Sequence, residues 1–218
     1  MNFIILGDKF QKRMKSRGCV GLIKINNKTI LQHQHKSIKS IFPEANIVYV
    51  HGFESKKFIN FLSKSSCLQK EIITIHNPNY EINNSVYSLY LAKEYLSDDC
   101  FIMFGDNLLG NNIFDKFNRQ NGSQIFINKK SKNKIGCVIN ENNIENISYD
   151  LDNYLSEIYF LQKQDSESLK LLINNDKYHN YFIFEIFNKL IDQQKNIKPF
   201  FINHKTNNIT FNYNKISK

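Results

Sequence analysis

Short apolar runs alternate with amphipathic stretches along the first half of the chain. The apolar runs predict buried strands at residues 2–6, 47–50, 71–75 and 100–104. Between them, apolar residues that recur with a period of roughly 3.6 predict helices at residues 28–42, 55–62 and 84–96. Strands that are apolar on both faces and separated by helices indicate a parallel sheet covered on both sides. The pattern therefore predicts an α/β fold of the nucleotide-binding kind.

The second half of the chain is less regular. Apolar runs predict strands at residues 123–127, 135–139 and 157–161, and closing strands at 200–203 and 209–213. Polar segments at 129–134 and 140–146 predict loops, and amphipathic stretches at 166–173 and 181–191 predict helices. The eight glycines and three prolines leave little room for flexible linkers. We expect one domain over residues 1–218, with a β-rich elaboration at about residues 120–163.

The composition argues against several classes of protein. No apolar run approaches the roughly 20 residues of a membrane helix, which predicts a cytoplasmic protein without a membrane span. The four cysteines lie far apart and form no C-x-x-C motif, so buried reduced thiols are favoured over a zinc or redox site. His33 and His35 are two positions apart and do not share a helix face, which predicts surface residues rather than a metal pair.

The formal charge of +9 invites a nucleic-acid interpretation. However, the chain is rich in Lys, Asn and Ile together, as AT-rich codons would produce, and most lysines are scattered. No known nucleic-acid module is present, so nucleic-acid binding is the least favoured function. One cluster concentrates the charge enough to indicate a phosphate-bearing ligand, and its members are Lys9, Lys12, Arg13, Lys15 and Arg17.

Two candidate sites follow predicted strands. Ligands of open α/β sheets bind at the carboxyl ends of the strands. The first candidate is the loop after residues 2–6, and the second is Gly105-Asp106-Asn107 after the apolar residues 100–104. An aspartate at such a strand end can hold Mg²⁺ together with substrate phosphates. The alternative for Asp106 is a turn or a helix cap, where aspartate is also common.

Several segments resemble one family of enzymes. The stretch 5–16 lies without a gap over the L-A-A-G-x-G-x-R-M-K-S opening of sugar-phosphate nucleotidyltransferases. Further segments resemble their sugar-phosphate and choline-phosphate branches in the same order, at residues 21–31, 83–89, 104–107, 156–161 and 185–191. The chain thus resembles the MobA-like nucleotidyltransferases. The resemblance implies a GT-A-type, Rossmann-like three-layer fold, with a mixed, mostly parallel sheet and helices on both faces.

The resemblance also implies a reaction and a set of site residues. In the family, a phosphate oxygen of a sugar phosphate or choline phosphate attacks the α-phosphate of an NTP, and pyrophosphate leaves. The implied partners are therefore an NTP and a phosphorylated small-molecule acceptor, with Mg²⁺ as cofactor. By this resemblance Asp106 holds the metal and Arg13 is catalytic, gripping the departing phosphates. The implied nucleotide-binding residues are Leu6, Gly7, Lys9, Lys12, Asn84 and Ser88.

The chain departs from the family at the same site. Lys9 and Gln11 stand where the family has two glycines, whose backbone N–H groups approach the phosphates closely. In this register Val20 replaces a lysine that neutralises the α-phosphate. The late strand that should supply a second metal carboxylate offers only Asn212 or Asn214. These losses argue against intact catalysis.

Two hypotheses follow from these departures. In the first, the chain is a nucleotidyltransferase with a modified site, in which Asp8 replaces a carboxylate and another cation replaces the missing lysine. The cations available for this are Lys9, Lys12, Lys15, Arg17 and Lys24. In the second, the chain is a pseudoenzyme that uses the fold for binding or assembly with a protein partner. An exposed aromatic patch within residues 154–187 would serve such a partner, although core packing explains most of these aromatic residues.

Overall fold

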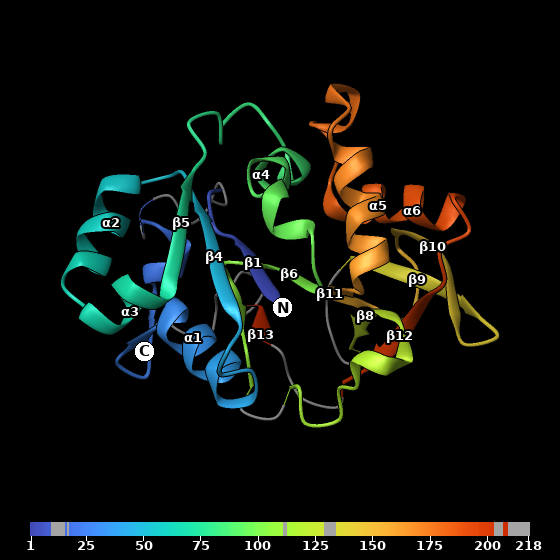
Figure 1. Cartoon of the computed structure of the whole chain (residues 1–218), viewed down its shortest axis with the longest axis horizontal. Coiled ribbons are helices and arrows are strands. Elements are labelled where there is room, and N and C mark those ends of the chain that lie inside the picture. The colour runs from blue at the N-terminus through green and yellow to red at the C-terminus, as the bar shows by residue number, and fades with distance from the viewer. Residues whose placement is uncertain (10–15, 17, 111–112, 129–133, 203–206, 209–218) are drawn as a thin grey trace.

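A seven-stranded sheet organises the chain, with strand order β12-β8-β11-β6-β1-β4-β5. The computed structural model describes residues 1–9, 16, 18–110, 113–128, 134–202 and 207–208 (Figure 1). The strands of this sheet are β1 (Asn2–Leu6), β4 (Asn46–His51), β5 (Ile72–His76), β6 (Cys100–Phe104), β8 (Ser123–Ile127), β11 (Leu155–Leu161) and β12 (Ile197–Phe201). The expected closing strand at 209–213 lies outside the described residues, as do Lys12 and Arg13.

The sheet is parallel except for one strand. β1 pairs in parallel with β4 and β6, and β12 pairs in parallel with β8. β11 runs antiparallel to both of its neighbours, β6 and β8. The carboxyl ends of β1, β4, β5 and β6 therefore meet at one edge, and the amino end of β11 lies at that same edge. All five residues of β1 are buried, as a central strand covered on both faces requires.

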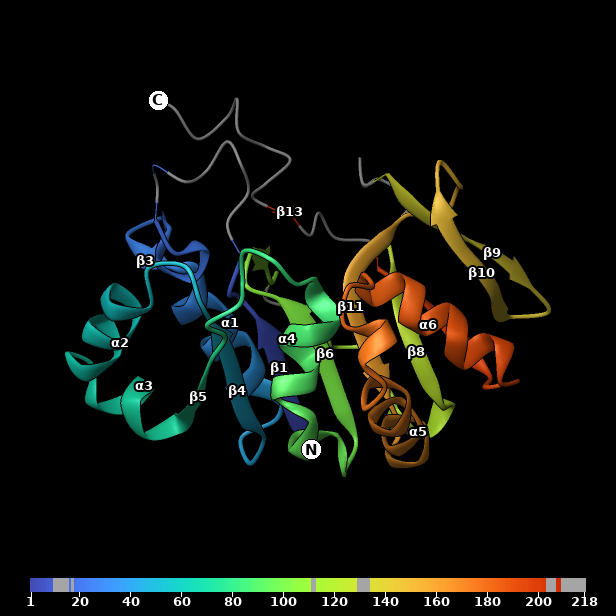
Figure 2. The same ribbon diagram turned by 90° about the horizontal axis from the view of Figure 1, so that it is seen from above.

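Helices cover both faces of the sheet (Figure 2). Phe3 and Ile5 of β1 pack in a buried cluster with residues of α1, α2 and α3. The alternate residues, Ile4 and Leu6, pack in a second buried cluster with α4, α5 and α6. The helices are α1 (Ile30–Ile41), α2 (Ser55–Ser63), α3 (Ser66–Glu71), α4 (Ser85–Leu91), α5 (Lys163–Ile173) and α6 (Ile183–Asp192). This arrangement confirms the predicted three-layer α/β fold.

Short elements connect these layers. Four of the described segments form 3-10 helices: η2 (Val20–Leu22), η3 (Lys93–Leu96), η4 (Arg119–Asn121) and η5 (Asp176–Tyr178). Three small antiparallel pairs also occur: β2 (Lys24–Ile25) with β3 (Lys28–Thr29), β7 (Asn107–Leu108) with β13 (Asn207–Asn208), and β9 (Ile135–Asn140) with β10 (Asn143–Tyr149). No helix among the described residues is long and apolar enough to cross a membrane.

The β9–β10 hairpin corrects one prediction. Residues 140–146 were expected to form a loop, but most of them belong to β10 or to its tight turn. Glu141 and Asn142 form that turn with positive φ angles of 46° and 66°, as a two-residue hairpin requires. A register shift between Ile144 and Asn146 breaks the alternation of apolar and polar residues. Because the strand signal is this alternation, the irregularity hides β10 in the sequence.

Candidate functional site

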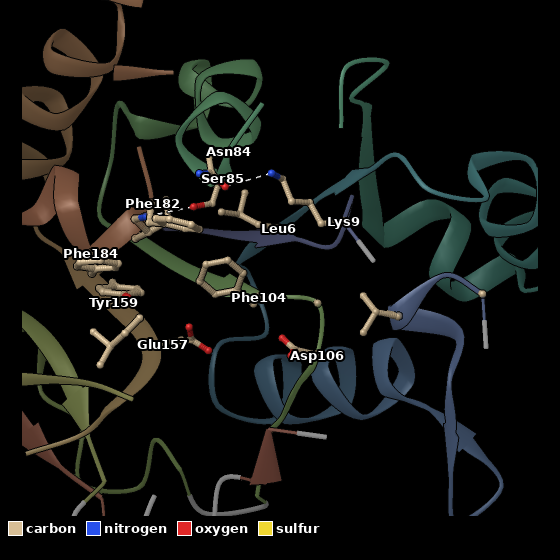
Figure 3. A pocket seen from close by; sticks show the side chains of 15 residues that line it. Leu6, Lys9, Asn84, Ser85, Phe104, Asp106, Glu157, Tyr159, Phe182 and Phe184 are labelled. Carbon is tan, nitrogen blue, oxygen red and sulfur yellow. Dashed lines mark hydrogen bonds between the residues drawn. The ribbon is translucent and has the colours of Figure 1, made fainter. Parts of the chain in front are cut away.

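A cavity of about 300 Å³ opens at the sheet edge where β1 and β6 end (Figure 3). One side is polar and comes from the loops after β1 and β6 and from the start of α4. The other side is apolar and comes from β9, β11 and the start of α6. The cavity is lined by Leu6, Lys9, Gly18, Val20, Asn84, Ser85, Phe104, Gly105, Asp106, Ile135, Glu157, Tyr159, Phe182, Ile183 and Phe184.

Close backbone packing explains the glycines at the ends of β1 and β6. A Cβ atom on Gly7 would lie 2.0 Å from the hydroxyl oxygen of Tyr49, a fully buried residue of β4. A Cβ atom on Gly105 would lie 2.7 Å from the Cα atom of Gly7. Both strand ends therefore need glycine because they touch each other and the same tyrosine. Gly7 supports the cavity from behind and is not part of its lining.

Lys9 places a cation at the polar side of the cavity. Its ammonium group donates hydrogen bonds to the backbone carbonyl of Asn83 and to Oδ1 of Asn84, the latter at 3.2 Å. The side chain thus spans from the β1 loop to the start of α4. Burial lowers the pKa of Lys9, and the nearby Asp8 charge opposes this effect. The residue that replaces a glycine of the family motif therefore brings a positive charge into the cavity.

The turn that carries Asp106 is held by hydrogen bonds from three directions. Oδ1 of Asn107 accepts a hydrogen bond from the backbone N–H of Phe104 at 2.7 Å, and its Nδ2 donates to the carbonyl of Ser156 at 3.1 Å. Nε2 of Gln34, on α1, donates to the carbonyls of Phe104 and Asn107 at 3.0 and 2.9 Å. These contacts join the turn to β11 and α1. They fix the backbone of Asp106, whose side chain lines the cavity.

Glu157 is a lining residue that the sequence analysis did not single out. It lies near the start of β11, where the pairing with β8 shifts register, and its φ of 56° is unusual for a strand residue. Figure 3 shows its carboxyl group on the same side of the cavity as that of Asp106. Two carboxylates beside a cavity that is open to a phosphate ligand fit Mg²⁺, which takes one or two carboxylates plus phosphates. The signal available in the sequence is one acid directly before the apolar run Ile158–Leu161.

The opposite wall of the cavity is aromatic. Tyr159 is almost fully buried, and its ring lies 4.5 Å from that of Phe187. The rings of Phe182 and Phe184 are stacked 5.9 Å apart at the start of α6. Phe182 is 43% exposed and faces the cavity, whereas Phe184 is buried. Core packing thus accounts for most of these aromatic residues, and Phe182 remains accessible to a ligand.

The residues predicted for the site fall into different places. Leu6, Lys9, Asn84 and Asp106 line the cavity. Ser88 is fully buried outside the lining, and its hydroxyl donates to Oδ2 of Asp8 at 2.8 Å.

Asp8 belongs to a buried network. Its Oδ2 also accepts a hydrogen bond from Nδ2 of Asn77 at 2.9 Å, and the residue is 2% exposed. Burial raises the pKa of this carboxyl, against the effect of the hydrogen bonds from Ser88 and Asn77. Asp8 is not part of the cavity lining. Its position therefore does not support the hypothesis that Asp8 replaces a metal-binding carboxylate of the family.

Val20 also lines the cavity. The position at which the resemblance expects a lysine therefore faces the ligand space, with an apolar side chain. Of the cations considered as replacements, Lys9 lines the cavity, while Lys12, Lys15 and Arg17 lie outside the described residues.

Comparisons with known proteins find similarity to nucleotidyltransferases. No protein-family model matches the chain. Over 99 residues it is 31% identical to a choline-phosphate cytidylyltransferase of Haemophilus influenzae. This match covers 44% of the present chain and 39% of that relative, so it spans about two fifths of the relative's length.

Solved structures match over nearly the whole chain. The CTP:phosphocholine cytidylyltransferase from Streptococcus pneumoniae has a TM-score of 0.77 at 18% identity, covering 94% of this chain and 91% of that one. The inositol-1-phosphate CTP transferase from T. maritima has a TM-score of 0.71 at 19% identity, covering 92% and 84%. A nucleoside-diphosphate-sugar pyrophosphorylase from Vibrio cholerae has a TM-score of 0.71 at 13% identity, covering 93% and 92%. The chain has a nucleotidyltransferase fold.

This nucleotidyltransferase fold confirms the resemblance found in the sequence. The structural matches include proteins whose names state choline-phosphate, inositol-phosphate and sugar-nucleotide substrates. At these identities the likeness establishes the fold, and a fold alone does not fix the chemistry of a site. The substrates and the turnover of this chain have to be argued from its own cavity.

Proposed function

We propose that the cavity binds a nucleoside triphosphate and a phosphorylated small-molecule acceptor, and that the chain transfers the nucleotidyl group from one to the other. The observation that carries this proposal is the meeting of Lys9, Asp106 and Glu157 in one cavity at the ends of β1 and β6. A cation and two carboxylates beside glycine-bearing strand ends suit a triphosphate and its counterion. This is the modified-site hypothesis, with Lys9 as the replacing cation.

Each residue has a role in the proposed reaction. A phosphate oxygen of the acceptor attacks the α-phosphorus, the bond from that phosphorus to the oxygen bridging to the β-phosphate breaks, and pyrophosphate leaves with the electron pair. Lys9 would neutralise phosphate charge from the side of α4, and Asp106 and Glu157 would hold Mg²⁺. When bound, Mg²⁺ supplies charge neutralisation at the reacting phosphates. The rigid turn around Asp106 keeps this carboxylate in place during the reaction.

The aromatic wall favours an acceptor of the choline-phosphate kind over a sugar phosphate. Sugar hydroxyls need hydrogen-bonding side chains, and the wall of Tyr159, Phe182, Ile183 and Phe184 is mainly apolar. A quaternary ammonium group is instead attracted to aromatic faces. The curated relative is named a choline-phosphate cytidylyltransferase, which supports CTP as the nucleotide.

A second candidate is a pseudoenzyme that binds a nucleotide without turning it over. The observation that favours it is Val20, which lines the cavity where the resemblance expects a lysine. Such a cavity keeps its carboxylates and can still bind a nucleotide. Because it lacks a cation near the α-phosphate, it would stabilise the transition state only poorly. In that case the fold serves binding or assembly with a protein partner.

Two measurements on the full chain test the proposal. Thermal unfolding with CTP, UTP, GTP or ATP plus Mg²⁺ reports binding, because a ligand that binds only the folded state raises Tm. We expect CTP to raise Tm the most. Pyrophosphate release with CTP and phosphocholine reports turnover, and we expect release with phosphocholine but not with glucose 1-phosphate.

The outcomes separate the candidates. A Tm shift without pyrophosphate release from any acceptor supports the pseudoenzyme. No shift with any of the nucleotides at millimolar concentration contradicts the enzyme and a pseudoenzyme that binds a nucleotide. The variant Lys9→Ala should remove most of the shift, whereas Lys198→Ala, at a half-buried lysine on β12 outside the cavity, should keep it.

A further inference from the structure

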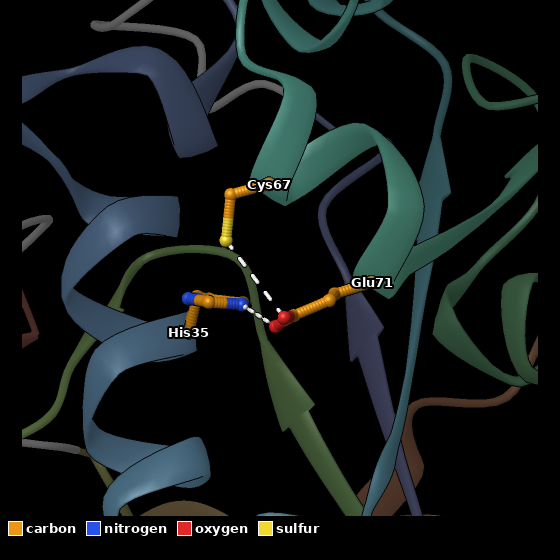
Figure 4. Close-up of side chains that lie close together, drawn as sticks. All are labelled: His35, Cys67 and Glu71. Atoms are coloured by element: carbon orange, nitrogen blue, oxygen red, sulfur yellow. Dashed lines mark hydrogen bonds and ion pairs between the residues drawn. The ribbon is translucent and has the colours of Figure 1, made fainter.

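A second cluster of ligand-type side chains lies away from the cavity, between α1 and α3 (Figure 4). His35, Cys67 and Glu71 bring together one imidazole, one thiol and one carboxylate. Their nearest ligand atoms all lie within 4.8 Å of one another. None of the three lines the candidate active site. The cluster therefore needs an explanation of its own.

The geometry of two helices produces the cluster. Cys67 and Glu71 are four positions apart on α3 and so share one face, with Sγ of Cys67 3.8 Å from Oε1 of Glu71. His35 reaches the other carboxylate oxygen from α1, with Nε2 of its ring 2.6 Å from Oε2. The side chain of His35 is 14% exposed, so the imidazole is fixed by packing while the carboxylate and the thiol face solvent.

One member of the cluster, Glu71, is a carboxylate and supplies an anionic ligand for a cation. Lys39 does not occupy the cluster, because its ammonium group donates to the carbonyls of Pro43 and Ala45 at 2.9 and 3.0 Å. Cys67 is the exposed member of the four cysteines, and an incoming metal can displace its proton.

We propose that His35, Cys67 and Glu71 bind Zn²⁺, with a water molecule at the fourth position. A mixed set of nitrogen, sulfur and oxygen ligands is typical of zinc, whereas Mg²⁺ and Ca²⁺ prefer oxygen alone. In a tetrahedral zinc site the ligand atoms lie roughly 3.3–3.8 Å apart, given the usual bond lengths. The separation of Sγ from Oε1 already fits this range. Rotation of the exposed Glu71 and Cys67 side chains adjusts the remaining distances.

The bound ion would tie α3 to α1. Gln34, the neighbour of His35 on α1, holds the turn of Asp106 through its amide. The proposed site is therefore a cross-link on the helix that supports the candidate active site. It stabilises the folded chain by mass action and takes no part in nucleotidyl transfer.

Cobalt tests the ligand set directly. The full chain is stripped with a chelator and titrated with Co²⁺ in excess Mg²⁺, which competes with Co²⁺ for the carboxylates of the cavity. We expect one equivalent of Co²⁺ to produce a thiolate-to-cobalt charge-transfer band, and Zn²⁺ to displace it. Because Cys19, Cys100 and Cys137 are buried, the band reports Cys67.

Variants decide between a metal site and a simple ion pair. Cys67→Ser should abolish the band, and Glu71→Gln and His35→Ala should each weaken Zn²⁺ binding roughly tenfold or more, measured by calorimetry. His33→Ala is the matched control, because His33 lies on the same helix but contacts the carbonyl of Ile25 outside the cluster. This variant should bind Zn²⁺ as tightly as the unmodified chain does. The proposal is overturned if the unmodified chain binds no Zn²⁺, or if Cys67→Ser and Glu71→Gln both bind it with unchanged affinity.

Discussion

The two sides of the cavity are built in different ways. The polar side consists of loops that follow the parallel strands β1 and β6, and its residues include Lys9 and Asp106. The apolar side comes from the antiparallel strand β11, the edge of the β9–β10 hairpin and the start of α6, and its residues include Tyr159 and Phe182. Glu157 stands on β11 but turns its carboxyl group to the side of Asp106 (Figure 3).

The register of the parallel strands fixes the polar side of the site. Leu6 pairs with Phe104 in the register of β1 and β6, so the two loops start side by side and Gly7 meets Gly105. The apolar side is paired less regularly: β11 is in register with β6 from Ile158 onward, but its pairing with β8 shifts register near Glu157. We infer that phosphate binding belongs to the polar side and acceptor choice to the apolar side. Variants on each side should therefore affect different substrates.

The largest effect is expected from Asp106→Asn. The substitution keeps the size of the side chain and removes its charge, so Mg²⁺ and the triphosphate lose an anionic ligand. We expect kcat/KM for pyrophosphate release to fall on the order of 10²–10³-fold. The thermal shift with CTP and Mg²⁺ should shrink in parallel.

Asp115→Asn is the matched control, because this exposed aspartate lies outside the cavity lining. It should leave both measurements unchanged. Equal kinetics for the Asp106 variant and the unmodified chain would remove Asp106 from the site and contradict the assignment of the polar side.

A smaller and more selective effect is expected from Phe182→Ala. The ring is 43% exposed at the cavity, so its removal should leave the fold intact and take away an aromatic face from the acceptor. We expect KM for phosphocholine to rise roughly tenfold while KM for CTP changes little, as judged from initial rates of pyrophosphate release.

Phe201→Ala provides the comparison, since Phe201 is 45% exposed at the end of β12 and does not line the cavity. A rise in the KM for CTP in the Phe182 variant, equal to that for phosphocholine, would show that the two sides do not divide the substrates as inferred.

Much of the first half of the fold follows from the sequence alone. The strands β1, β4, β5 and β6 lie within one or two residues of their predicted ranges, because each is a continuous apolar run between helices. The place of Asp106 in the cavity lining agrees with the same reasoning, since the end of a buried strand is a defined place in a parallel sheet. In this half of the chain, the apolar pattern of each strand agrees with its buried place in the parallel sheet, so the sequence predicts the strands well.

The rest required the structure, for physical reasons. The β10 strand was hidden by its irregular register, and α3 was missed because it has only six residues. Glu157 belongs to a strand in the structure as in the prediction, but its positive φ, which no sequence pattern indicates, turns its side chain toward the cavity. His35 was expected at the surface, and its contact with Cys67 and Glu71 depends on the packing of two helices far apart in sequence. Such contacts leave no periodic signal.

A buried histidine at the end of β4 gives the chain a response to acid, which is the weakest effect that we expect. His51 lies outside the cavity lining, on the strand that pairs with β1, and is 4% exposed, stacked between Phe58 and His76. Burial, with a contribution from His76, lowers its pKa from 6.5 to about 4. As the pH falls below about 6.5, the unfolded chain binds a proton that the folded chain does not, so the free energy of unfolding decreases.

The variant His51→Phe keeps the ring stack and removes the titrating group. Between about pH 7 and about pH 5.5, the unmodified chain should lose about 1 kcal/mol more unfolding free energy than this variant, measured by urea denaturation. The comparison of the two slopes cancels titrating groups that do not contact His51, such as Asp8, whereas His76 stacks on His51 and contributes to the difference. Identical slopes would mean that His51 becomes protonated without cost in the folded chain. The end of β4 would then give the chain no sensitivity to acid.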